Sequence, residues 1–382
     1  MFVIRFSSLS DTELIQLAEE KLTTDLADWE RNIWQFIRNW FNPSVTSIKI
    51  FTSGSTGSPK QIEHSKQAML NSARMTGKVL DLKEGDNTLL CLPTSKIAGM
   101  MMVVRSICTK MDLHCIQPSA TPLKDLEEGT KISFAAFTPM QLHSAAKNFA
   151  HFKAAQTIDK IIVGGEAISA EVLDIVNRFS NKVYHTFGMT ETISHIALKR
   201  LNGKEADAHY QVLDGITIST GEQNRLIIEA PELSQPHLVT NDVVRLVVVS
   251  KVTNNSNETY NSHQQFDWLG RTDNVINSGG VKIYPEELEQ KLQSHIQPAF
   301  FITAIPDEVT GNKLVLAIEM ISLTESDKQE LREEFSKFDK LHRPKAVLLF
   351  GRFVKTTNGK TRRKETMQGA YERIDMETII AK

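Results

Sequence analysis

The segment from Thr52 to Lys60 constrains this chain more than any other part of it. It reads Thr-Ser-Gly-Ser-Thr-Gly-Ser-Pro-Lys and lies between two short β-like runs, Ile48–Phe51 and Gln61–Glu63. Glycines let the backbone turn its N–H groups inward, hydroxyls add donors and a lysine adds positive charge, which together suit a polyphosphate. The segment therefore predicts a phosphate-binding loop, although a flexible Ser/Gly turn has the same composition.

Two well-known loops of similar composition do not fit this segment. A Walker loop runs directly into a helix and ends in Gly-Lys-Ser/Thr, whereas here Pro59 and Lys60 lead into a second strand. A nucleophile elbow begins with a glycine, and Ser53 occupies that position. The phosphate-binding interpretation remains.

Strand-like and helical runs alternate after this loop. The expected strands are Thr88–Leu92, Phe134–Phe137, Lys160–Val163 and Lys182–Tyr184. The expected helices are one that Ser65 caps and that continues to about Leu82, Ile97–Met111, Gln141–Ala150 and Ala170–Phe179. The alternation predicts an α/β domain with largely buried strands, preceded by a helical region over residues 11–42.

The residue pattern changes twice further along the chain. Residues 201–265 carry β-branched runs between turn residues and predict an antiparallel β subdomain, with a surface turn at residues 253–258. After Trp268 the pattern predicts a compact α+β region, which includes helices over 285–293 and 325–338 and a strand over 346–350. We therefore expect two domains, residues 1–273 and residues 274–382.

The charge and cysteine content exclude several classes of protein. Lys and Arg number 44 against 46 Asp and Glu, for a net charge of −2, so no global field attracts nucleic acid or anionic membranes. The three cysteines contain no CxxC pair and fit neither a disulfide framework nor a zinc site. Met1 to Ser8 is too short for a signal peptide, and no apolar run approaches the roughly 18 residues that span a bilayer. We expect a cytoplasmic protein that binds neither nucleic acid nor membrane.

Further motifs follow the loop in a recognisable order. They are Phe187–Thr192 (Phe-Gly-Met-Thr-Glu-Thr), Trp268–Asn274, Gly279-Gly280 with residues 283–287, Lys355–Arg363, and the weaker Gly164–Ala167 and Thr240–Asp242. Together with the loop they resemble the motifs of the adenylate-forming superfamily, which includes acyl- and aryl-CoA synthetases, luciferases and nonribosomal-peptide adenylation domains. The resemblance covers residues 51–363. It implies that family's fold, a large α/β domain with an antiparallel β subdomain and a small mobile carboxy-terminal α+β domain, here shortened at the amino terminus.

The resemblance also implies roles for the residues that face the phosphates. Ser53, Thr56 and Lys60 would hold the β- and γ-phosphates of ATP, Thr190 would contact the α-phosphate, and Glu191 would ligate Mg²⁺, for which a carboxylate is a suitable hard ligand. Since a carboxylate must approach a polyanion, neutralisation and in-line positioning must provide most of the rate. The full set that the resemblance assigns to ATP is Thr52, Ser53, Gly54, Ser55, Thr56, Gly57, Lys60, Gly164, Gly165, Glu166, Phe187, Gly188, Asp242 and Arg271.

The nucleoside would be held by a second group of residues. Phe187 would stack on adenine where the family usually has tyrosine, with the loss of a hydroxyl only. Gly164 and Gly165 would press their backbone against the other face of the base, although an ordinary strand-to-loop turn explains this pair equally well. Asp242 and Arg271 would bind the ribose hydroxyls.

Lys360 is the residue that we expect to act in the first half-reaction. An ammonium between the attacking carboxylate and the α-phosphate offsets charge in the ground and transition states. The surrounding basic run, Lys355–Lys364, could instead be a solvated tail or a patch that binds RNA. The resemblance further implies a swing of the small domain about Asn274, where the family more often has Asp or Lys, and presentation of Gly279 and Gly280 to coenzyme A.

The helix after Lys96 bears on the acid substrate. Its Ile97-x-Gly99 start, apolar continuation and Arg105 resemble the o-succinylbenzoate-CoA ligases of menaquinone synthesis, whose arginine here is associated with the second carboxylate of the substrate. A guanidinium that faces the pocket would satisfy such a charge, whereas the alternative is an ordinary surface ion pair. Ser95 and Lys96 replace the aromatic-His pair of many relatives. His195 would either line the acyl pocket or pack in the core.

These observations predict an AMP-forming acid-thiol ligase that uses ATP, Mg²⁺ and coenzyme A, with o-succinylbenzoate as the acid. The alternatives of the same class are another aryl- or acyl-CoA ligase and an adenylation enzyme that loads a carrier protein. A nucleotide-binding protein without turnover and an RNA-binding protein are the alternatives of other classes. The sequence leaves a homo-oligomer open.

Overall fold

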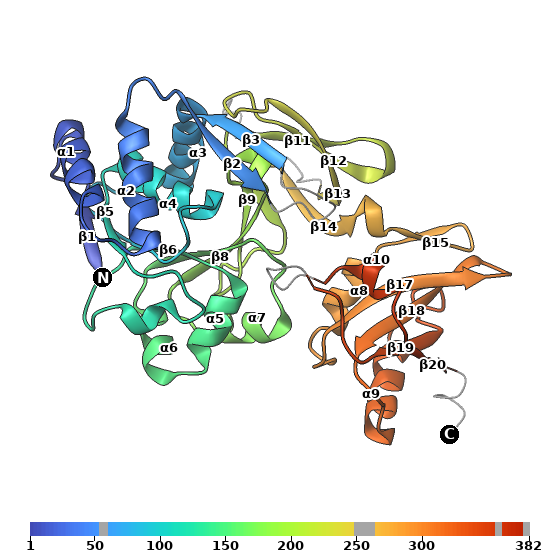
Figure 1. Cartoon of the computed structure of the whole chain (residues 1–382). Helices are drawn as coiled ribbons and strands as arrows, with labels where there is room; N and C mark the ends of the chain where they lie inside the picture. The colour runs from blue at the N-terminus through green and yellow to red at the C-terminus, as the bar shows by residue number, and fades with distance from the viewer. Residues whose placement is uncertain (53–59, 248–263, 356–360, 377–382) are drawn as a thin grey trace, which may run out of the picture. The chain divides into compact units, whose positions relative to one another are not determined.

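The computed structural model describes residues 1–52, 60–247, 264–355 and 361–376 (Figure 1). Ser53 to Gly57 of the predicted phosphate loop, the turn at 253–258 and Lys360 lie outside the described residues. The chain divides into two compact units. The first comprises Met1–Ser219, Ile227–Leu238 and Leu246–Asp267, and the second Thr220–Leu226, Val239–Arg245 and Trp268–Lys382. The domain boundary after residue 273 stays a prediction.

Helices in the first unit follow local sequence signals closely. They are α1 (Asp11–Leu22), α2 (Asp28–Phe41), α3 (Lys66–Val79), α4 (Ile97–Thr109), α5 (Pro139–Ala146), α6 (Phe149–Gln156) and α7 (Ala170–Asn177), with the 3-10 turns η1 (Pro122–Asp125) and η2 (Thr190–Thr192). The helical region expected over residues 11–42 is two helices. The hydroxyls of Thr23 and Thr24 donate to the carbonyls of Glu20 and Lys21 at 2.7 Å each, which satisfies the end of α1 and stops it.

One large sheet holds most of the described strands. Its strands are β1 (Phe2–Arg5), β4 (Asn87–Leu90), β5 (Asp112–Cys115), β6 (Phe134–Phe137), β7 (Lys160–Val163), β8 (Lys182–Gly188), β9 (His195–Arg200), β10 (Tyr210–Val212), β11 (Thr217–Thr220), β12 (Arg225–Glu229), β13 (His237–Val247) and β14 (Gln265–Arg271). Their order is β1-β5-β4-β6-β7-β8-β9-β10-β14-β13-β12-β11. Strands β5, β4, β6, β7 and β8 are parallel neighbours, whereas β9 and β10 pair antiparallel. The expected α/β class is confirmed.

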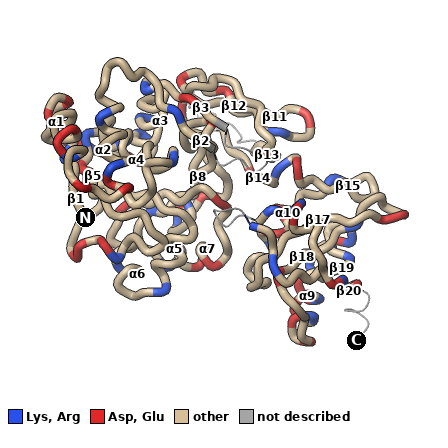
Figure 2. Tube along the Cα trace, viewed as in Figure 1, with Lys and Arg blue, Asp and Glu red and all other residues tan. Residues whose placement is uncertain are grey.

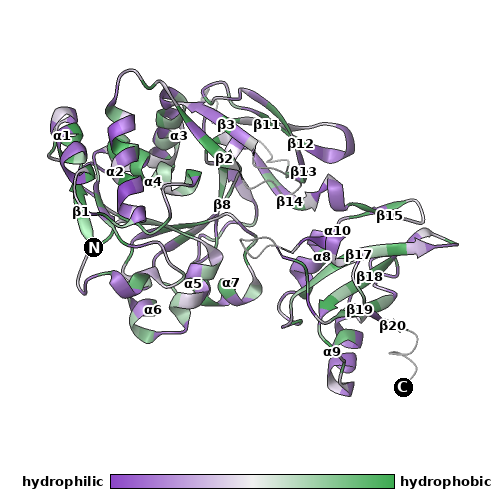
Figure 3. Ribbon diagram, viewed as in Figure 1, coloured by the Kyte–Doolittle hydropathy of each residue, from purple (hydrophilic) through white to green (hydrophobic). Residues whose placement is uncertain are grey.

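The parallel strands are buried between helices, and their common direction places the loops that follow them at one edge of the sheet. All four residues of β6 are buried, as are three of the four in β7, because α1 to α4 lie on one side of the sheet and α5 to α7 on the other (Figures 1 and 3). The carboxyl ends of parallel strands meet at the same edge, which is where open α/β sheets bind ligands. Gly164 follows β7 and Met189 follows β8 at this edge.

Two further strands form a hairpin beside the large sheet. β2 (Ser47–Thr52) and β3 (Lys60–Ser65) pair antiparallel from Ser47 opposite Ser65 to Thr52 opposite Lys60. The hairpin thus brackets residues 53–59, as the two predicted β-like runs require.

The second unit is a small α+β structure, as expected. Its elements are η4 (Thr272–Asn274), β15 (Ile276–Ser278), β16 (Val281–Ile283), α8 (Pro285–Leu292), β17 (Phe300–Asp307), β18 (Gly311–Glu319), α9 (Glu325–Ser336), β19 (Ala346–Phe350), α10 (Arg363–Thr366) and β20 (Glu372–Asp375). The sheet order is β17-β18-β19-β20. Leu316 and Leu349 pack with Phe335 on one face, and Val315 packs with Leu348 on the other.

The described residues carry charges of both signs and free thiols. Lys and Arg are interspersed with Asp and Glu along both units (Figure 2). The described residues contain no helix of the length and apolar character that a bilayer crossing requires. Cys91, Cys108 and Cys115 are free thiols, of which Cys91 and Cys115 are buried.

The cap of α3 gives a direct test of a local sequence signal. The Ser65 hydroxyl accepts the backbone N–H of Ala68 at 3.1 Å. We expect Ser65→Ala to lower the free energy of unfolding by about 1 kcal/mol, and Ser65→Asn to lower it by a few tenths only, because asparagine caps as well as serine. Urea unfolding followed by circular dichroism checks this, and equal losses for both variants would contradict the capping role.

Candidate functional site

Two glycines bring the ends of β7 and β8 close together. A Cβ on Gly164 would lie 2.0 Å from Thr186 Oγ1, and a Cβ on Gly188 would lie 2.3 Å from the carbonyl oxygen of Ser194. Gly165 has φ +91°, and a Cβ there would meet no atom within 4 Å. Only glycine fits at positions 164 and 188. Gly165 leaves its backbone open to space in which a flat ligand can approach it.

An aromatic cluster fixes the orientation of Phe187. Its ring lies edge-on to Phe266 at 5.0 Å and to Tyr210 at 5.7 Å between centroids. The Tyr210 hydroxyl lies 2.7 Å from His185 Nδ1, and His185 Nε2 lies 3.1 Å from the Glu166 carbonyl. Since a carbonyl only accepts, His185 donates through Nε2 and accepts from Tyr210 through Nδ1. The three segments that carry Glu166, Phe187 and Tyr210 are thereby joined.

The turn from Gly188 to Ser194 holds the predicted phosphate and metal residues. Thr190 and Glu191 lie in η2, and the N–H of Met189 donates to Thr192 Oγ1 at 3.1 Å. Ile193 has φ +67° and ψ −52°, in the region that costs a β-branched residue about 1–3 kcal/mol. Its side chain is fully buried, which offsets this strain. The turn is therefore held by its surroundings and not by its own preference.

A chain of hydrogen bonds runs from Arg105 to α3. Arg105 Nη2 donates to Ser194 Oγ at 2.5 Å, Ser194 Oγ lies 3.3 Å from His195 Nδ1, and His195 Nε2 lies 3.1 Å from Thr76 Oγ1. Thr76 Oγ1 donates to the Ser72 carbonyl at 3.2 Å. Each of the two hydroxyls in this row of hydrogen bonds, those of Ser194 and Thr76, therefore accepts one hydrogen bond and donates another. Burial holds the pKa of His195 well below 6.5, and the ring is neutral at neutral pH.

Arg105 itself is a buried charge with no carboxylate partner among the residues that the structure describes. It is 2% exposed, and none of the described carboxylates forms an ion pair with it. Burial lowers its pKa to about 10, so the guanidinium stays charged at neutral pH. Its Nε is buried and has no partner among the described atoms. The structure therefore does not show the ordinary surface ion pair that was the alternative from the sequence.

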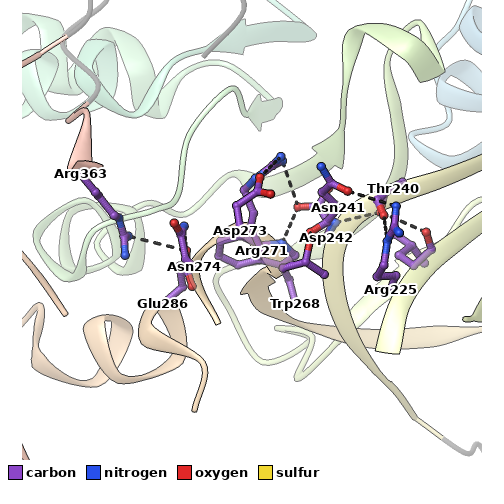
Figure 4. Close-up of polar contacts among 12 residues, drawn as sticks. Arg225, Thr240, Asn241, Asp242, Trp268, Arg271, Asp273, Asn274, Glu286 and Arg363 are labelled. Atoms are coloured by element: carbon purple, nitrogen blue, oxygen red, sulfur yellow. Dashed lines mark hydrogen bonds and ion pairs between the residues drawn. The ribbon is translucent and has the colours of Figure 1, made fainter. Parts of the chain in front are cut away.

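The second unit brings Asp242 and Arg271 together (Figure 4). Trp268 Nε1 donates to Asp242 Oδ1 at 2.9 Å, and Arg271 Nη1 lies 4.0 Å from the same oxygen. The Asp242 N–H donates to Thr240 Oγ1 at 3.0 Å. Asp242 is 8% exposed, so its carboxylate is held in one place. The ribose role of the pair stays a prediction.

Asn274 is bonded to a buried carboxylate of the same unit. Asn274 Nδ2 donates to Glu286 Oε1 at 2.5 Å, and Arg363 Nη2 lies 3.7 Å from that oxygen and 2.7 Å from Glu289 Oε2 (Figure 4). Glu286 Oε2 is buried without a partner among the described atoms. Burial raises the pKa of Glu289, while Arg363 opposes this rise.

Gly279 and Gly280 form the two-residue turn between β15 and β16. Their φ values are +56° and +81°, which only glycine adopts readily at two adjacent positions. The Gly279 N–H donates to the Thr310 carbonyl at 3.0 Å. The turn is thus anchored, and its role toward coenzyme A stays a prediction.

The remaining predicted site residues are only partly described. Thr52 ends β2 and Lys60 begins β3. Sequence reasoning missed the polar partners of the predicted residues, which are His64, Thr76 and Ser194 in the first unit and Trp268 and Glu286 in the second. Trp268 and Glu286 lie inside quoted motifs and bond to residues 26 and 12 positions away. Ser194, Thr76 and His64 instead pair with residues 89, 119 and 126 positions away, which no local pattern reveals.

Comparison with known proteins places this geometry in a family. The family model for AMP-binding enzymes matches residues 5–218. A crystal structure of an acyl-CoA synthetase (AMP-forming)/AMP-acid ligase II-like protein from Dyadobacter fermentans is 31% identical, covers 96% of this chain and 99% of that chain, and has a TM-score of 0.61. The chain belongs to the AMP-binding enzyme family.

Curated relatives carry a more specific name. The 2-succinylbenzoate--CoA ligase of Salmonella typhimurium is 27% identical over 287 residues, which are 74% of this chain and 60% of that enzyme. The chain therefore spans less than two thirds of the length of this relative. The o-succinylbenzoate coenzyme A synthetase of Bacillus subtilis, in complex with ATP and a magnesium ion, shares the fold at 19% identity and a TM-score of 0.64, over 84% of this chain and 69% of that chain.

Buried histidines make the stability of the fold depend on pH. Burial lowers the pKa of His64, His114, His185 and His195 from 6.5, to about 4 for His185. In the unfolded chain these rings bind protons below about pH 6.5, whereas in the folded protein they stay neutral to lower pH. The stabilisation is complete above pH 6.5 and is lost as the pH falls toward the folded values.

We expect the free energy of unfolding to fall between pH 7.5 and pH 5.0, by up to about 1.4 kcal/mol per pH unit for each such ring. Urea unfolding at several pH values measures this slope. His185→Gln removes one of the rings and should reduce the slope. A stability that is flat or that rises on acidification would contradict the neutral assignment.

Proposed function

We propose that this protein is an AMP-forming acid-thiol ligase. It converts a carboxylate and ATP to an acyl-adenylate and pyrophosphate, and then transfers the acyl group to coenzyme A. We propose o-succinylbenzoate as the acid, as the names of the curated relatives indicate. The free, mostly buried thiols fit a reducing cytoplasm, which is where we place the enzyme.

One observation carries the choice of acid: Arg105 is buried and has no carboxylate partner among the described residues. A guanidinium that is buried without a counter-ion costs several kcal/mol, and a single hydroxyl at 2.5 Å does not neutralise it. A monocarboxylic fatty acid would leave this charge unpaired, since its one carboxylate is consumed by adenylation. A dicarboxylic acid supplies a second anion that stays charged and can form a charge-assisted bond with Arg105.

The described residues of the first unit also fit a nucleotide with its metal. Glu191 offers a half-buried carboxylate for which no cationic partner occurs among the described side chains, and one carboxylate together with phosphate oxygens is the usual protein site for Mg²⁺. Gly165 offers open backbone to the base. When bound, Mg²⁺ supplies neutralisation of the phosphates. Thr190 and Glu191 orient the reacting end of the substrate because their turn is held rigidly.

Further residues of the chain have the remaining roles in binding and catalysis. Ser194 presents a hydroxyl to Arg105 and so keeps its guanidinium oriented while the acid is absent. Lys360 brings the two anions together in the first half-reaction, and Gly279 and Gly280 face the thiol in the second. These last two roles rest on the motifs and on family membership.

Arg105 offers the sharpest test of the acid. We expect Arg105→Met to raise the KM for o-succinylbenzoate by roughly 10- to 100-fold, because one charge-assisted hydrogen bond is lost. For benzoate-like monoacids the KM should change little. A pyrophosphate-release screen over a panel of acids, with and without coenzyme A, measures both values.

Arg74→Ala is the matched control for this variant, because Arg74 is an exposed arginine of α3 that bonds only to Asn71 among the described residues. An unselective rise in KM for all acids would remove the argument for a dicarboxylic substrate. Turnover that prefers a different acid would favour another aryl-CoA ligase, and acid-dependent pyrophosphate release without thioester formation would favour the loading of a carrier protein.

Lys360 separates the two half-reactions. We expect Lys360→Ala to lower adenylate formation by two or more orders of magnitude, since the charge between the two anions is lost, and to spare thioester formation from pre-made acyl-adenylate. Rapid-quench measurement of each half-reaction tests this prediction, with Lys364→Ala as a control for the basic tail. An equal loss of both steps would contradict the assigned role.

A further inference from the structure

The hairpin that brackets the predicted phosphate loop has little support of its own. In the described part of the chain β2 and β3 form a sheet of two strands, and an isolated two-stranded hairpin is marginally stable in water. The Lys66 N–H donates to the Thr46 carbonyl at 3.0 Å, and Lys66 Nζ donates to the Asn42 carbonyl at 2.8 Å, so the base of the hairpin is tied down. Ile48, Ile50 and Ile62 of the hairpin are also buried, and a directional contact nearer the predicted nucleotide residues would fix how the hairpin lies against the turn.

His64 of β3 makes such a contact. The side chain is fully buried, and its Nε2 lies 2.7 Å from the carbonyl oxygen of Thr190, 126 residues further along the chain. The carbonyl can only accept, so Nε2 carries the proton. The other ring nitrogen, Nδ1, is buried and has no partner among the described atoms. Burying an unpartnered acceptor is unfavourable, and a leucine would avoid this loss, so the bond to Thr190 is what a histidine adds at this position.

The receiving turn needs an external constraint. Ile193 is held at positive φ, and Gly188 has no room for a Cβ. Thr192 Oγ1 ties the turn to the Met189 and Ser194 backbone, but these contacts lie within the turn itself. The bond from His64 joins the turn to a separate sheet, at the carbonyl directly before Glu191.

We propose that His64 is a positioning residue that ties the β2–β3 hairpin to the Thr190–Glu191 turn and so holds the two nucleotide-binding segments in register. This inference rests on the proposed function, in which the hairpin carries the phosphate loop and the turn carries the α-phosphate and Mg²⁺ contacts. His64 is not a catalytic residue, because it touches the backbone of the turn and not the reacting groups.

Two substitutions of similar polarity separate this role from simple packing. In His64→Gln the side-chain amide nitrogen occupies the place of Nε2 and can still donate to Thr190. In His64→Asn the amide reaches only the place of Nδ1, so the bond is lost. His114→Asn is the matched control, because His114, although only partly buried, likewise has one bonded and one buried, unpartnered ring nitrogen, and it bonds to Asn87.

The experiment measures acid-dependent pyrophosphate release as a function of Mg²⁺·ATP, together with hydrogen exchange of the amides from Met189 to Ser194. We expect His64→Asn to lower kcat/KM for Mg²⁺·ATP by about tenfold, the effect of one lost hydrogen bond, and to increase exchange in the turn. His64→Gln should stay within about threefold of the wild type, and His114→Asn should leave both readouts unchanged. Melting temperatures of all three variants show whether a loss of kcat/KM is explained by lower stability alone.

Equal losses in His64→Asn and His64→Gln, or losses in proportion to the melting temperature, would overturn the inference. Unchanged exchange and kinetics in His64→Asn would overturn it as well. If the wild type released no pyrophosphate with any acid, the proposed function would fail, while the exchange measurement would still report whether His64 anchors the turn. The two failures are therefore distinguishable.

Discussion

The backbone turn from Gly188 to Ser194 is the constraint on which the first unit depends. It carries Thr190 and Glu191 at one end and Ser194 at the other, within seven residues. Its conformation is unfavourable by itself, because Ile193 is β-branched and lies at positive φ. Buried contacts from distant segments, His64 to the Thr190 carbonyl and Arg105 to the Ser194 hydroxyl, impose it. The same short segment thus joins the residues proposed to bind the nucleotide to the serine that orients Arg105.

Arg105 is a buried charge that is oriented but, among the described residues, not neutralised. It lies on α4, where the neighbouring side chains Met101, Met102, Val103 and Val104 are fully buried. Its polar contacts, a serine and a weak thioether acceptor, orient the guanidinium without neutralising it. A neutral His195 continues the chain of hydrogen bonds to α3, where a charged ring would repel Arg105. Among the described residues, the guanidinium therefore keeps a positive charge that no carboxylate neutralises, and our proposal assigns this charge to the second carboxylate of the acid.

In the second unit, Asn274 at the predicted hinge is complementary to its buried partner, Glu286. Asn274 donates its amide to Glu286, which also faces Arg363 at the start of α10. Of the two residues that the family more often has here, an aspartate would set two carboxylates against one another, whereas a lysine, like asparagine, would supply a donor. Gly270, at φ +146°, leaves room for Glu286, since a Cβ there would lie 2.3 Å from Oε2. The departure of Asn274 from the usual residue therefore matches its local surroundings.

The sequence by itself determined the features that depend on neighbouring residues. The limits of β6, β7 and β19 agree with the expected ones, and Ser65 caps α3, because side-chain periodicity and capping act over a few residues. The order of the motifs indicated the family. The break between α1 and α2 was missed, because it depends on the hydroxyls of Thr23 and Thr24, and neither Gly nor Pro marks it.

Only the tertiary structure decided how the site is held. Ser194 lies 89 residues from Arg105, Thr76 lies 119 from His195, and His64 lies 126 from Thr190. No local pattern specifies such pairs, since the packing of the sheet brings them together. Whether Arg105 faces the substrate or forms an ordinary surface ion pair was likewise open in the sequence. The structure buries it without an ion pair among the described residues, and burial is a property of the whole fold that the residue type alone does not reveal.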